Sequence, residues 1–158
     1  MKWILATLLC LFATFPVISA EPKPRVIILL GPPASGKGTQ AQFITKELGI
    51  PHISTGDLLR ENIKNHTKLG AEAQFYINQG KLVPDAIVLN MVFQRISQPD
   101  AKNGYLLDGF PRTIPQAEAY TKYIGDEVKP IVINLEVPDD ILLERIASRQ
   151  RLEGRADD

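Results

Sequence analysis

A glycine-rich segment near the start of the chain has the residue types that bind phosphate. Residues 31–39 are Gly-Pro-Pro-Ala-Ser-Gly-Lys-Gly-Thr. Gly31 and Gly36 permit backbone conformations and close approaches that a Cβ atom would block, so successive amide groups can point at phosphate oxygens. Lys37 can then reach the outer phosphates of a nucleotide, and the Thr39 hydroxyl can face Mg²⁺. Many glycine-rich turns only join two elements, but this combination predicts a phosphate-binding loop.

Two arginines in separate segments could bind a second phosphate group. Arg60 ends the segment 52–60, His-Ile-Ser-Thr-Gly-Asp-Leu-Leu-Arg, and Arg112 lies within 104–117, Gly-Tyr-Leu-Leu-Asp-Gly-Phe-Pro-Arg-Thr-Ile-Pro-Gln-Ala. A guanidinium group can donate two parallel hydrogen bonds to one phosphate, which a lysine cannot do as well. A lone arginine is usually a solvated surface charge, so the prediction depends on where these segments lie in the fold.

Short apolar runs alternate with helical patterns along the chain. The predicted strands are Val26–Leu30, His52–Ser54, Tyr105–Leu107 and Ile131–Leu135, and all except the short second one are predicted to be buried. Six helices are predicted: Lys37 to about Glu47, Asp57 to Asn65, Leu69 to Gln79, Pro84 to about Arg95, Pro115 to about Tyr123, and one that begins at Pro138. The last helix is expected to carry Ile141, Leu142 and Ile146 toward the core. This alternation predicts an α/β fold with a parallel sheet. Ligands of such sheets bind beyond the carboxyl ends of the strands, where all three segments fall.

Composition narrows the class of function. The chain has 158 residues, with 18 basic and 18 acidic side chains that cancel, so bulk charge does not favour nucleic acid or an anionic membrane as a partner. Phosphate binding must therefore come from a local site. Cys10 is the single cysteine, which excludes an internal disulfide and a cysteine-based zinc site. His52 and His66 are far apart in sequence, and we expect ordinary surface or packing roles for both.

The first twenty residues differ from the rest. Lys2 precedes an apolar stretch that ends in Ile-Ser-Ala before Glu21. This pattern is typical of a secretory signal peptide, but the run also approaches the roughly 20 residues that span a bilayer, and a start codon chosen too far upstream would look the same. We therefore expect residues 1–20 to be a signal peptide or anchor, 21–25 a linker, and 26–158 a single domain.

The segments resemble signatures of the adenylate kinase family, in the expected order and over most of residues 26–149. The loop variant Gly-Lys-Gly-Thr-Gln, the segments 52–60 and 104–117, and the segment 80–85, Gly-Lys-Leu-Val-Pro-Asp, all match. The resemblance implies a three-layer P-loop fold with a small helical AMP-binding insertion at about 54–83 and a short lid from about 149–158. It also implies reversible Mg²⁺-dependent phosphoryl transfer, ATP + AMP to two ADP.

The same resemblance implies roles for individual residues. Catalysis would involve Lys37, Arg112, Arg145, Arg149 and Arg155. ATP would contact Gly31, Ala34, Ser35, Gly36, Lys37, Gly38, Thr39, Arg145 and Arg149. AMP would contact Thr55, Arg60, Lys81, Leu82, Val83, Gly109, Phe110, Pro111, Arg112, Gln116 and Arg155. Mg²⁺ would be held through water near Thr39, Asp57 and Asp108; a helix N-terminal capping role for Asp57 is equally compatible with the sequence.

Substrate and compartment follow in the same way. Thr55 and Thr113 favour AMP over UMP or CMP as the acceptor, and no Asn-Lys-x-Asp sequence indicates guanine binding. The implied partners are ATP, AMP and ADP, with no nucleic acid. The implied state is a cytoplasmic monomer, which would contact a membrane only if the N-terminal segment is retained. That segment by itself would favour export.

The resemblance fails at the C-terminal end. The family continues with a helix that carries another phosphate-binding arginine, a last strand and a closing helix, and none of these is present. We therefore expect the strand at 131–135 to have an unpaired apolar edge. The alternative to an active enzyme is a truncated, non-catalytic nucleotide-binding remnant.

Overall fold

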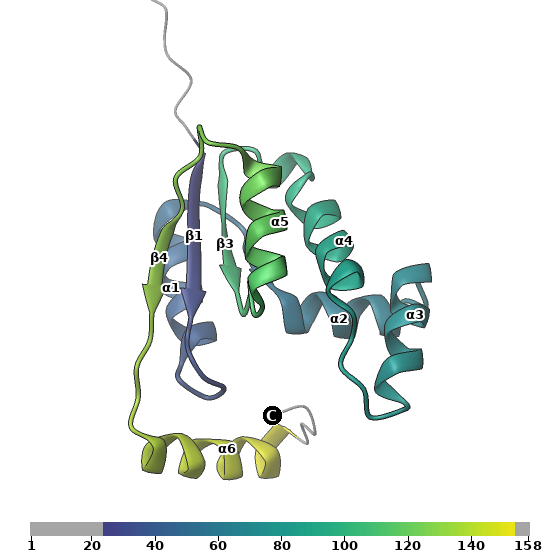
Figure 1. Ribbon diagram of the computed structural model, residues 1–158. Helices are drawn as coiled ribbons and strands as arrows, with labels where there is room; N and C mark the ends of the chain where they lie inside the picture. The colour runs from purple at the N-terminus through teal and green to yellow at the C-terminus, as the bar shows by residue number, and fades with distance from the viewer. Residues whose placement is uncertain (1–23, 154–158) are drawn as a thin grey trace, which may run out of the picture.

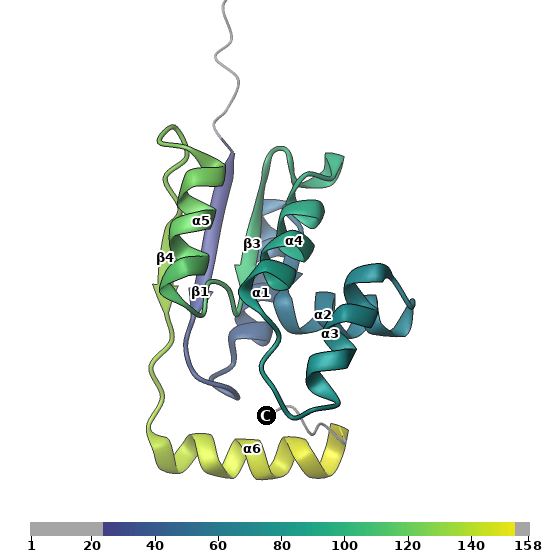
Figure 2. The same ribbon diagram turned by 45° about the vertical axis from the view of Figure 1, so that its right-hand side comes forward.

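The computed structural model describes residues 24–153, which fold as a parallel sheet between helices (Figures 1 and 2). The strands are β1 (Arg25–Leu30), β2 (His52–Ser54), β3 (Gly104–Asp108) and β4 (Ile131–Asn134). The helices are α1 (Lys37–Leu48), α2 (Thr55–Lys64), α3 (Lys68–Ile77), α4 (Asp85–Ile96), the 3₁₀ turn η1 (Pro99–Ala101), α5 (Ile114–Ile124) and α6 (Asp139–Glu153). The predicted α/β class and the order of elements are confirmed. Pro84 is the residue before α4 rather than within its first turn.

Within the described residues the sheet has the strand order β2-β3-β1-β4, and every pair is parallel. Leu29 of β1 and Ser54 of β2 both pair with Asp108 of β3. The carboxyl ends of these three strands therefore lie at one level of one sheet edge, which is the lower edge in Figure 1.

The two faces of the sheet are covered by different helices, because alternate strand residues point to opposite faces. Ile27 and Leu29 pack in a cluster with residues of α1 such as Ala41. Val26 and Ile28 pack in another cluster, which includes Val92 of α4 and residues of α5. Each fully buried aliphatic side chain of this kind stabilises the fold by roughly 1.5–3 kcal/mol. These clusters are the two interfaces of the predicted three-layer arrangement.

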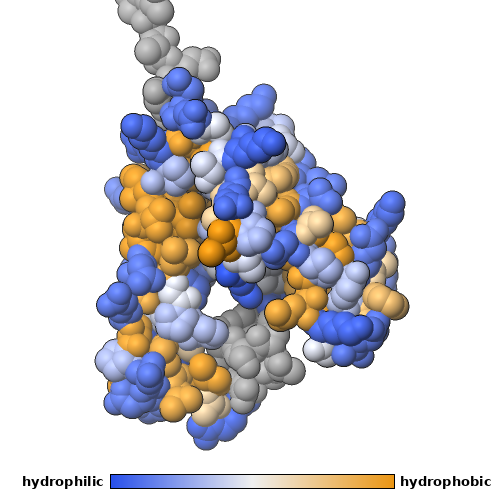
Figure 3. Space-filling view, viewed as in Figure 1, coloured by the Kyte–Doolittle hydropathy of each residue, from blue (hydrophilic) through white to orange (hydrophobic). Residues whose placement is uncertain are grey.

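Strand β4 departs from the prediction of a buried strand. Its four residues are all exposed, although it pairs with β1 in parallel register. Ile131 and Val132 are 59% and 56% exposed, and Figure 3 shows an apolar surface over this strand. An apolar run signals burial only when a layer covers both sides of the strand, and the exposure of all four residues shows that β4 lacks such a complete cover within the described residues. The expected apolar edge is present.

Helices α2 and α3 form a pair beside the sheet, in the region predicted as the AMP-binding insertion. Gly70 of α3 faces the end of α2, where an added Cβ atom would lie 2.1 Å from the carbonyl oxygen of Asn62. Only glycine permits this approach. The functional role of the insertion stays a prediction.

Helix α6 buries fewer of its apolar side chains than the sequence predicts. Leu142 is buried, but Ile141 is exposed and Ile146 only half-buried, so the prediction that all three point into the core is correct for one. Among the described residues, no helix is both long and apolar enough to cross a membrane. The predicted signal or anchor segment, residues 1–20, lies outside the described residues.

A buried tyrosine pair joins the sheet to α5 and generates a stability prediction. The hydroxyl groups of Tyr105 and Tyr120 are 2.9 Å apart, and both residues are almost fully buried. The Tyr120→Phe change leaves the Tyr105 hydroxyl without this partner, so we expect the free energy of unfolding to fall by about 1–3 kcal/mol, measured by urea denaturation. Tyr123→Phe, at an exposed tyrosine, is the control and should change it little.

The same pair predicts the direction of alkaline destabilisation. Burial raises the pKa of both tyrosines above their ordinary value. The stabilisation linked to these pKa shifts is fully present below the unfolded-state pKa of about 10 and is lost as the pH rises beyond it. We expect Tyr120→Phe to make the loss of stability above pH about 10 less steep than in the unmodified chain. An unchanged slope would contradict this assignment.

Candidate active site

The candidate site is built where β1, β2 and β3 end. The phosphate loop follows β1, Thr55 follows β2, and Asp108 is the last residue of β3. Since the strand ends are in register, three segments far apart in sequence meet at one edge of the sheet, as the sequence predicts.

The phosphate loop depends on two glycines with positive φ angles. Gly31 has φ +142°, and an added Cβ atom would lie 2.6 Å from the carbonyl oxygen of Leu135. Gly36 has φ +96° and is the N-cap of α1, a position that has no side-chain cap here. The first amide groups of a helix have no partner within it and carry the positive end of the helix dipole. An uncapped N-terminus at a glycine turn is therefore suited to phosphate.

Two side chains of the loop point to an anionic ligand. The Lys37 ammonium group donates hydrogen bonds to the carbonyl oxygens of Gly31, at 2.9 Å, and Pro32, at 2.7 Å, which holds the charge against the loop. The hydroxyl of Ser35 is buried and has no hydrogen-bond partner among the described residues. Buried polar groups are normally paired, so this hydroxyl is available to a phosphate oxygen.

Asp108 connects the loop to the neighbouring strands. Its carboxylate lies 3.2 Å from His52 Nε2, and it is the group nearest to a Cβ atom added at Gly38, at 4.0 Å. Both side chains are largely buried, with exposures of 12% for Asp108 and 25% for His52. We expected an ordinary surface or packing role for His52 and did not predict this contact. The partners are 56 residues apart, and only the parallel register brings them together.

Thr55, Gly109 and Arg112 form one contact group. The Thr55 hydroxyl donates to the carbonyl oxygen of Gly109 at 2.9 Å, and Arg112 Nε donates to the same oxygen at 2.8 Å. Gly109 has φ +74°, and a Cβ atom there would lie 3.0 Å from Arg112 Nη2 and 3.2 Å from Thr55 Oγ1. Three of the residues predicted to bind AMP are therefore neighbours, with the Arg112 side chain exposed.

Arg60 lies next to this group. Its guanidinium is 3.1 Å from a Cβ atom built on Gly56, the residue after Thr55. It also donates to Asp57 Oδ1 at 2.7 Å. Partial burial would raise the pKa of Asp57, but the hydrogen bonds to Arg60 and Ser54 outweigh burial and lower it. Ser54 is the N-cap of α2, so the capping role considered for Asp57 is wrong.

Gln116 is buried at the start of α5, and both ends of its side-chain amide are hydrogen-bonded. Its Oε1 accepts from the backbone N–H of Arg112 at 2.8 Å, and its Nε2 donates to the carboxylate of Asp85. Asp85 is a site-adjacent residue that the sequence analysis missed. Its position at the end of the segment 80–85 was the available signal. Phe110, also predicted, is completely buried and packs edge-on against Tyr120 at 5.6 Å, and Pro111 follows it.

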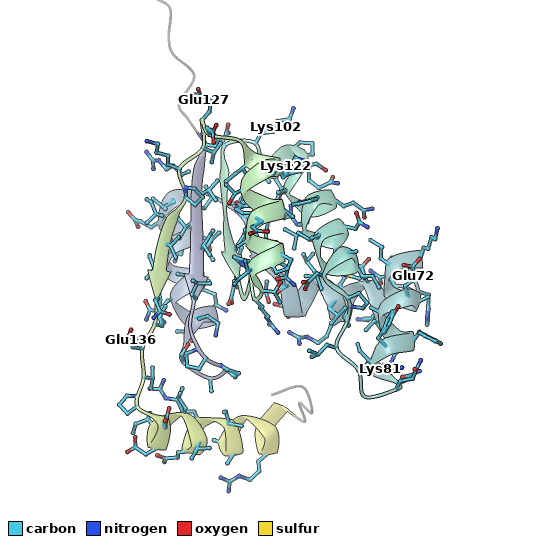
Figure 4. The ribbon with its side chains drawn as sticks, viewed as in Figure 1. Glu72, Lys81, Lys102, Lys122, Glu127 and Glu136 are labelled. Atoms are coloured by element: carbon cyan, nitrogen blue, oxygen red, sulfur yellow. The ribbon has the colours of Figure 1, made fainter. Side chains whose placement is uncertain are left out.

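The remaining predicted AMP residues lie between α3 and α4. Figure 4 shows Lys81 at the turn after α3, where its side chain donates to Gln79. Leu82 is 94% exposed and Val83 half-buried. A hollow of about 620 Å³ lies between α3 and α4 and is mostly apolar, with Phe75, Tyr76 and Ile87 among its lining residues. It contains no arginine or lysine and is not a phosphate site.

Of the three arginines predicted near the C-terminal end, Arg145, Arg149 and Arg155, the first is described in full. It is exposed, and its Nη1 lies 3.4 Å from the carbonyl oxygen of Ala34 in the phosphate loop, so α6 does bring a positive charge to the loop. The side chain of Arg149 and the whole of Arg155 lie outside the described residues.

The residues present fit a magnesium ion held mainly by substrate. No group of three or more His, Cys, Asp or Glu residues in the described part of the chain could hold a metal on its own. Mg²⁺ in nucleotide sites keeps most of its waters and binds phosphates with one or two carboxylates. Asp108, near Gly38, offers such a carboxylate, and Thr39 is exposed beside the loop.

Comparison with known proteins identifies the family. A family model described as adenylate kinase matches residues 29–157. The chain belongs to the adenylate kinase family. The expected family resemblance and P-loop kinase fold are thereby confirmed.

Curated relatives agree with this assignment. The chain is 57% identical to an adenylate kinase of Lachnoclostridium phytofermentans over 126 residues, 78% of this chain and 58% of the relative. It is 56% identical to one of Caldicellulosiruptor saccharolyticus, over 78% of this chain and 59% of the relative. For one of Methanocella arvoryzae the identity is 51%, covering 78% and 58%. The chain thus spans a little under three fifths of the length of these relatives.

Gly109 gives a direct test of the contact group. In Gly109→Ala, the added Cβ atom must displace Arg112 or Thr55, so we expect AMP affinity to fall by about tenfold, equivalent to about 1.4 kcal/mol. The positive φ angle adds a stability cost of about 1–2 kcal/mol. Calorimetric titration with AMP and urea denaturation would measure the two effects.

The matched control is Gly49→Ala. Gly49 has φ +65° but no atom within 4 Å of an added Cβ. It should lose similar stability while retaining AMP affinity. Equal losses of affinity in both variants would show that strain, not displacement of the contact group, is responsible.

Proposed function

We propose that this chain is an adenylate kinase, which transfers a phosphoryl group reversibly between ATP and AMP to give two ADP. The observation that carries the proposal is the arrangement of two phosphate-binding groups along one sheet edge, with Asp108 between them. One is the phosphate loop with Lys37, and the other is the pair Arg60 and Arg112 around Thr55 and Gly109. The family membership supports the same reaction.

The proposed mechanism relies on position and charge. A phosphate oxygen of AMP attacks the γ-phosphorus of ATP, and the bond from that phosphorus to the oxygen bridging it to the β-phosphate breaks. Both products are ADP, and no proton has to be removed, because the attacking oxygen is already anionic. The loop amides and Lys37 bind the donor phosphates, while Arg60 and Arg112 hold the acceptor phosphate in line.

Magnesium would neutralise charge on the donor phosphates when it is bound. Thr39 and Asp108 are the residues that would hold it, through its water molecules. Asp57, already paired with Arg60, would do so only at longer range. Arg145, with Arg149 and Arg155, would add positive charge as the site closes and excludes water.

The remaining substrate contacts follow the sequence predictions. Thr55 and Gln116 would contact the adenine of AMP, together with the backbone of 81–83 and 109. We further infer a monomer in the cytoplasm, where ATP and AMP are present. N-terminal sequencing of the mature protein tests this compartment: removal of residues 1–20 would contradict it.

Lys37 tests the reaction. We expect Lys37→Met to lower the turnover rate by about 100-fold or more, the scale of losing one charge-stabilising group at a reacting phosphate. A coupled assay of ADP formation from ATP, AMP and Mg²⁺ measures it on the whole chain. Lys46→Met, at the far end of α1, is the control and should retain full activity.

Binding separates the enzyme from a nucleotide-binding remnant. If the unmodified chain binds a bisubstrate analogue, with two adenosines joined by phosphates, but produces no ADP, the catalytic proposal fails and the remnant is favoured. Turnover that is insensitive to Lys37→Met would overturn the role of the loop.

A further inference from the structure

The side-chain amide of Gln116 is held by two partners of opposite kind. The backbone N–H of Arg112 donates to Oε1, and the Asp85 carboxylate accepts from Nε2. A backbone N–H can only donate, and an ionised carboxylate can only accept. Rotating the amide by 180° would therefore break both hydrogen bonds. The orientation of this amide is fixed by chemistry at both ends.

Asp85 is itself held in place. The Thr113 hydroxyl accepts from the backbone N–H of Gln116, at 3.2 Å, and donates its proton to Asp85 Oδ2, at 2.8 Å. With Gln116 Nε2 on Oδ1, the two oxygens of the carboxylate are both engaged, and a closed ring joins Asp85, Thr113 and Gln116. Asp85 begins α4 and Thr113 is the N-cap of α5, so negative charge here is also stabilised by helix N-termini. In Figures 1 and 2 both helices begin on the side to which the strands point.

The fixed amide has one donor and one acceptor left. A primary amide has two N–H groups and an oxygen with two lone pairs, and the partners described use one of each. The spare N–H is on the Asp85 side and the spare lone pair is on the Arg112 side. The spare N–H and the spare lone pair of the Gln116 amide can therefore pair with the edge of a 6-aminopurine, whose N1 accepts and whose N6 amino group donates. A 6-oxopurine has the reverse order, since its N1–H donates and its O6 accepts.

We propose that Asp85 is a specificity-determining residue, which selects 6-amino over 6-oxopurine monophosphates by fixing the orientation of the Gln116 amide. The inference rests on the proposed function, in which Gln116 contacts the acceptor base. Asp85 acts through Gln116 and is a positioning residue. In Asp85→Asn, the new amide can donate as well as accept, so it no longer opposes the reversed orientation of Gln116.

AMP and IMP are the matched ligand pair, because they differ only at this edge of the base. We expect the whole chain to bind AMP at least about tenfold more tightly than IMP, and Asp85→Asn to reduce that ratio by about tenfold, as expected for one hydrogen bond. Calorimetric titration of both variants with both nucleotides measures the ratio. Asp100→Asn is the control: Asp100 pairs with Arg95 at 2.8 Å on the surface, and its loss should leave the ratio unchanged.

If Asp85 served stability alone, its loss would weaken the binding of both nucleotides alike. An unchanged ratio of AMP affinity to IMP affinity in Asp85→Asn therefore overturns the proposal for Asp85. Failure of the unmodified chain to bind either nucleotide overturns the proposed function instead.

A measurement without ligand adds a second test. The side-chain amide protons of Gln116 should exchange with water at least about tenfold more slowly than those of exposed Gln42, and faster in Asp85→Asn. Equal exchange at Gln116 and Gln42 in the unmodified chain overturns the proposal.

Discussion

The parallel pairing of β3 with β1 and β2 is the interaction on which the site depends. Asp108 is opposite Leu29 on one side and Ser54 on the other, so three chain segments leave the sheet at one level. A slip of one residue in either pair would turn every side chain to the other face. It would also separate Asp108 from Gly38 and His52. A chain with no net charge can bind several phosphate groups only if its few positive and N–H groups are gathered in this way.

The sheet also fixes how firmly each part of the site is held. Phe110 connects the residues predicted to bind AMP to the core, since it is completely buried and packs on Tyr120. Arg112 and Gln116 follow within six residues and take their backbone positions from it. One hydrogen bond of the buried Gln116 side chain, from Nε2 to Asp85, then reaches across to α4. Core packing and the positions of the residues proposed to bind AMP therefore depend on the same set of contacts on this side of the site.

Sequence patterns predicted the parts of the site that are local in the chain. The loop at 31–39 combines a strand, glycines and a helix within a few residues, so its conformation follows from local chemistry. The contacts of Asp85 and His52 depend on register and on how two helix ends meet, which no local pattern contains. The exposure of β4 was misjudged for a related reason: an apolar run does not say whether a layer covers it. For Asp57, competition from Ser54 as the helix cap decided the outcome.

The two sides of the site differ in support, and this difference bears on what the chain can do. Arg112 and Thr55 share a carbonyl oxygen at hydrogen-bond distances of 2.8 Å and 2.9 Å. Arg145 reaches the phosphate loop through a single exposed contact of 3.4 Å, beyond the usual range for such bonds, from a helix with Leu142 as its buried apolar residue. In the proposed function, binding of the acceptor phosphate would therefore draw on preformed geometry. In the proposed reaction, neutralising the transferred group would require Arg145 to lie closer to the loop than this contact holds it, so transfer would demand more of the structure than binding would.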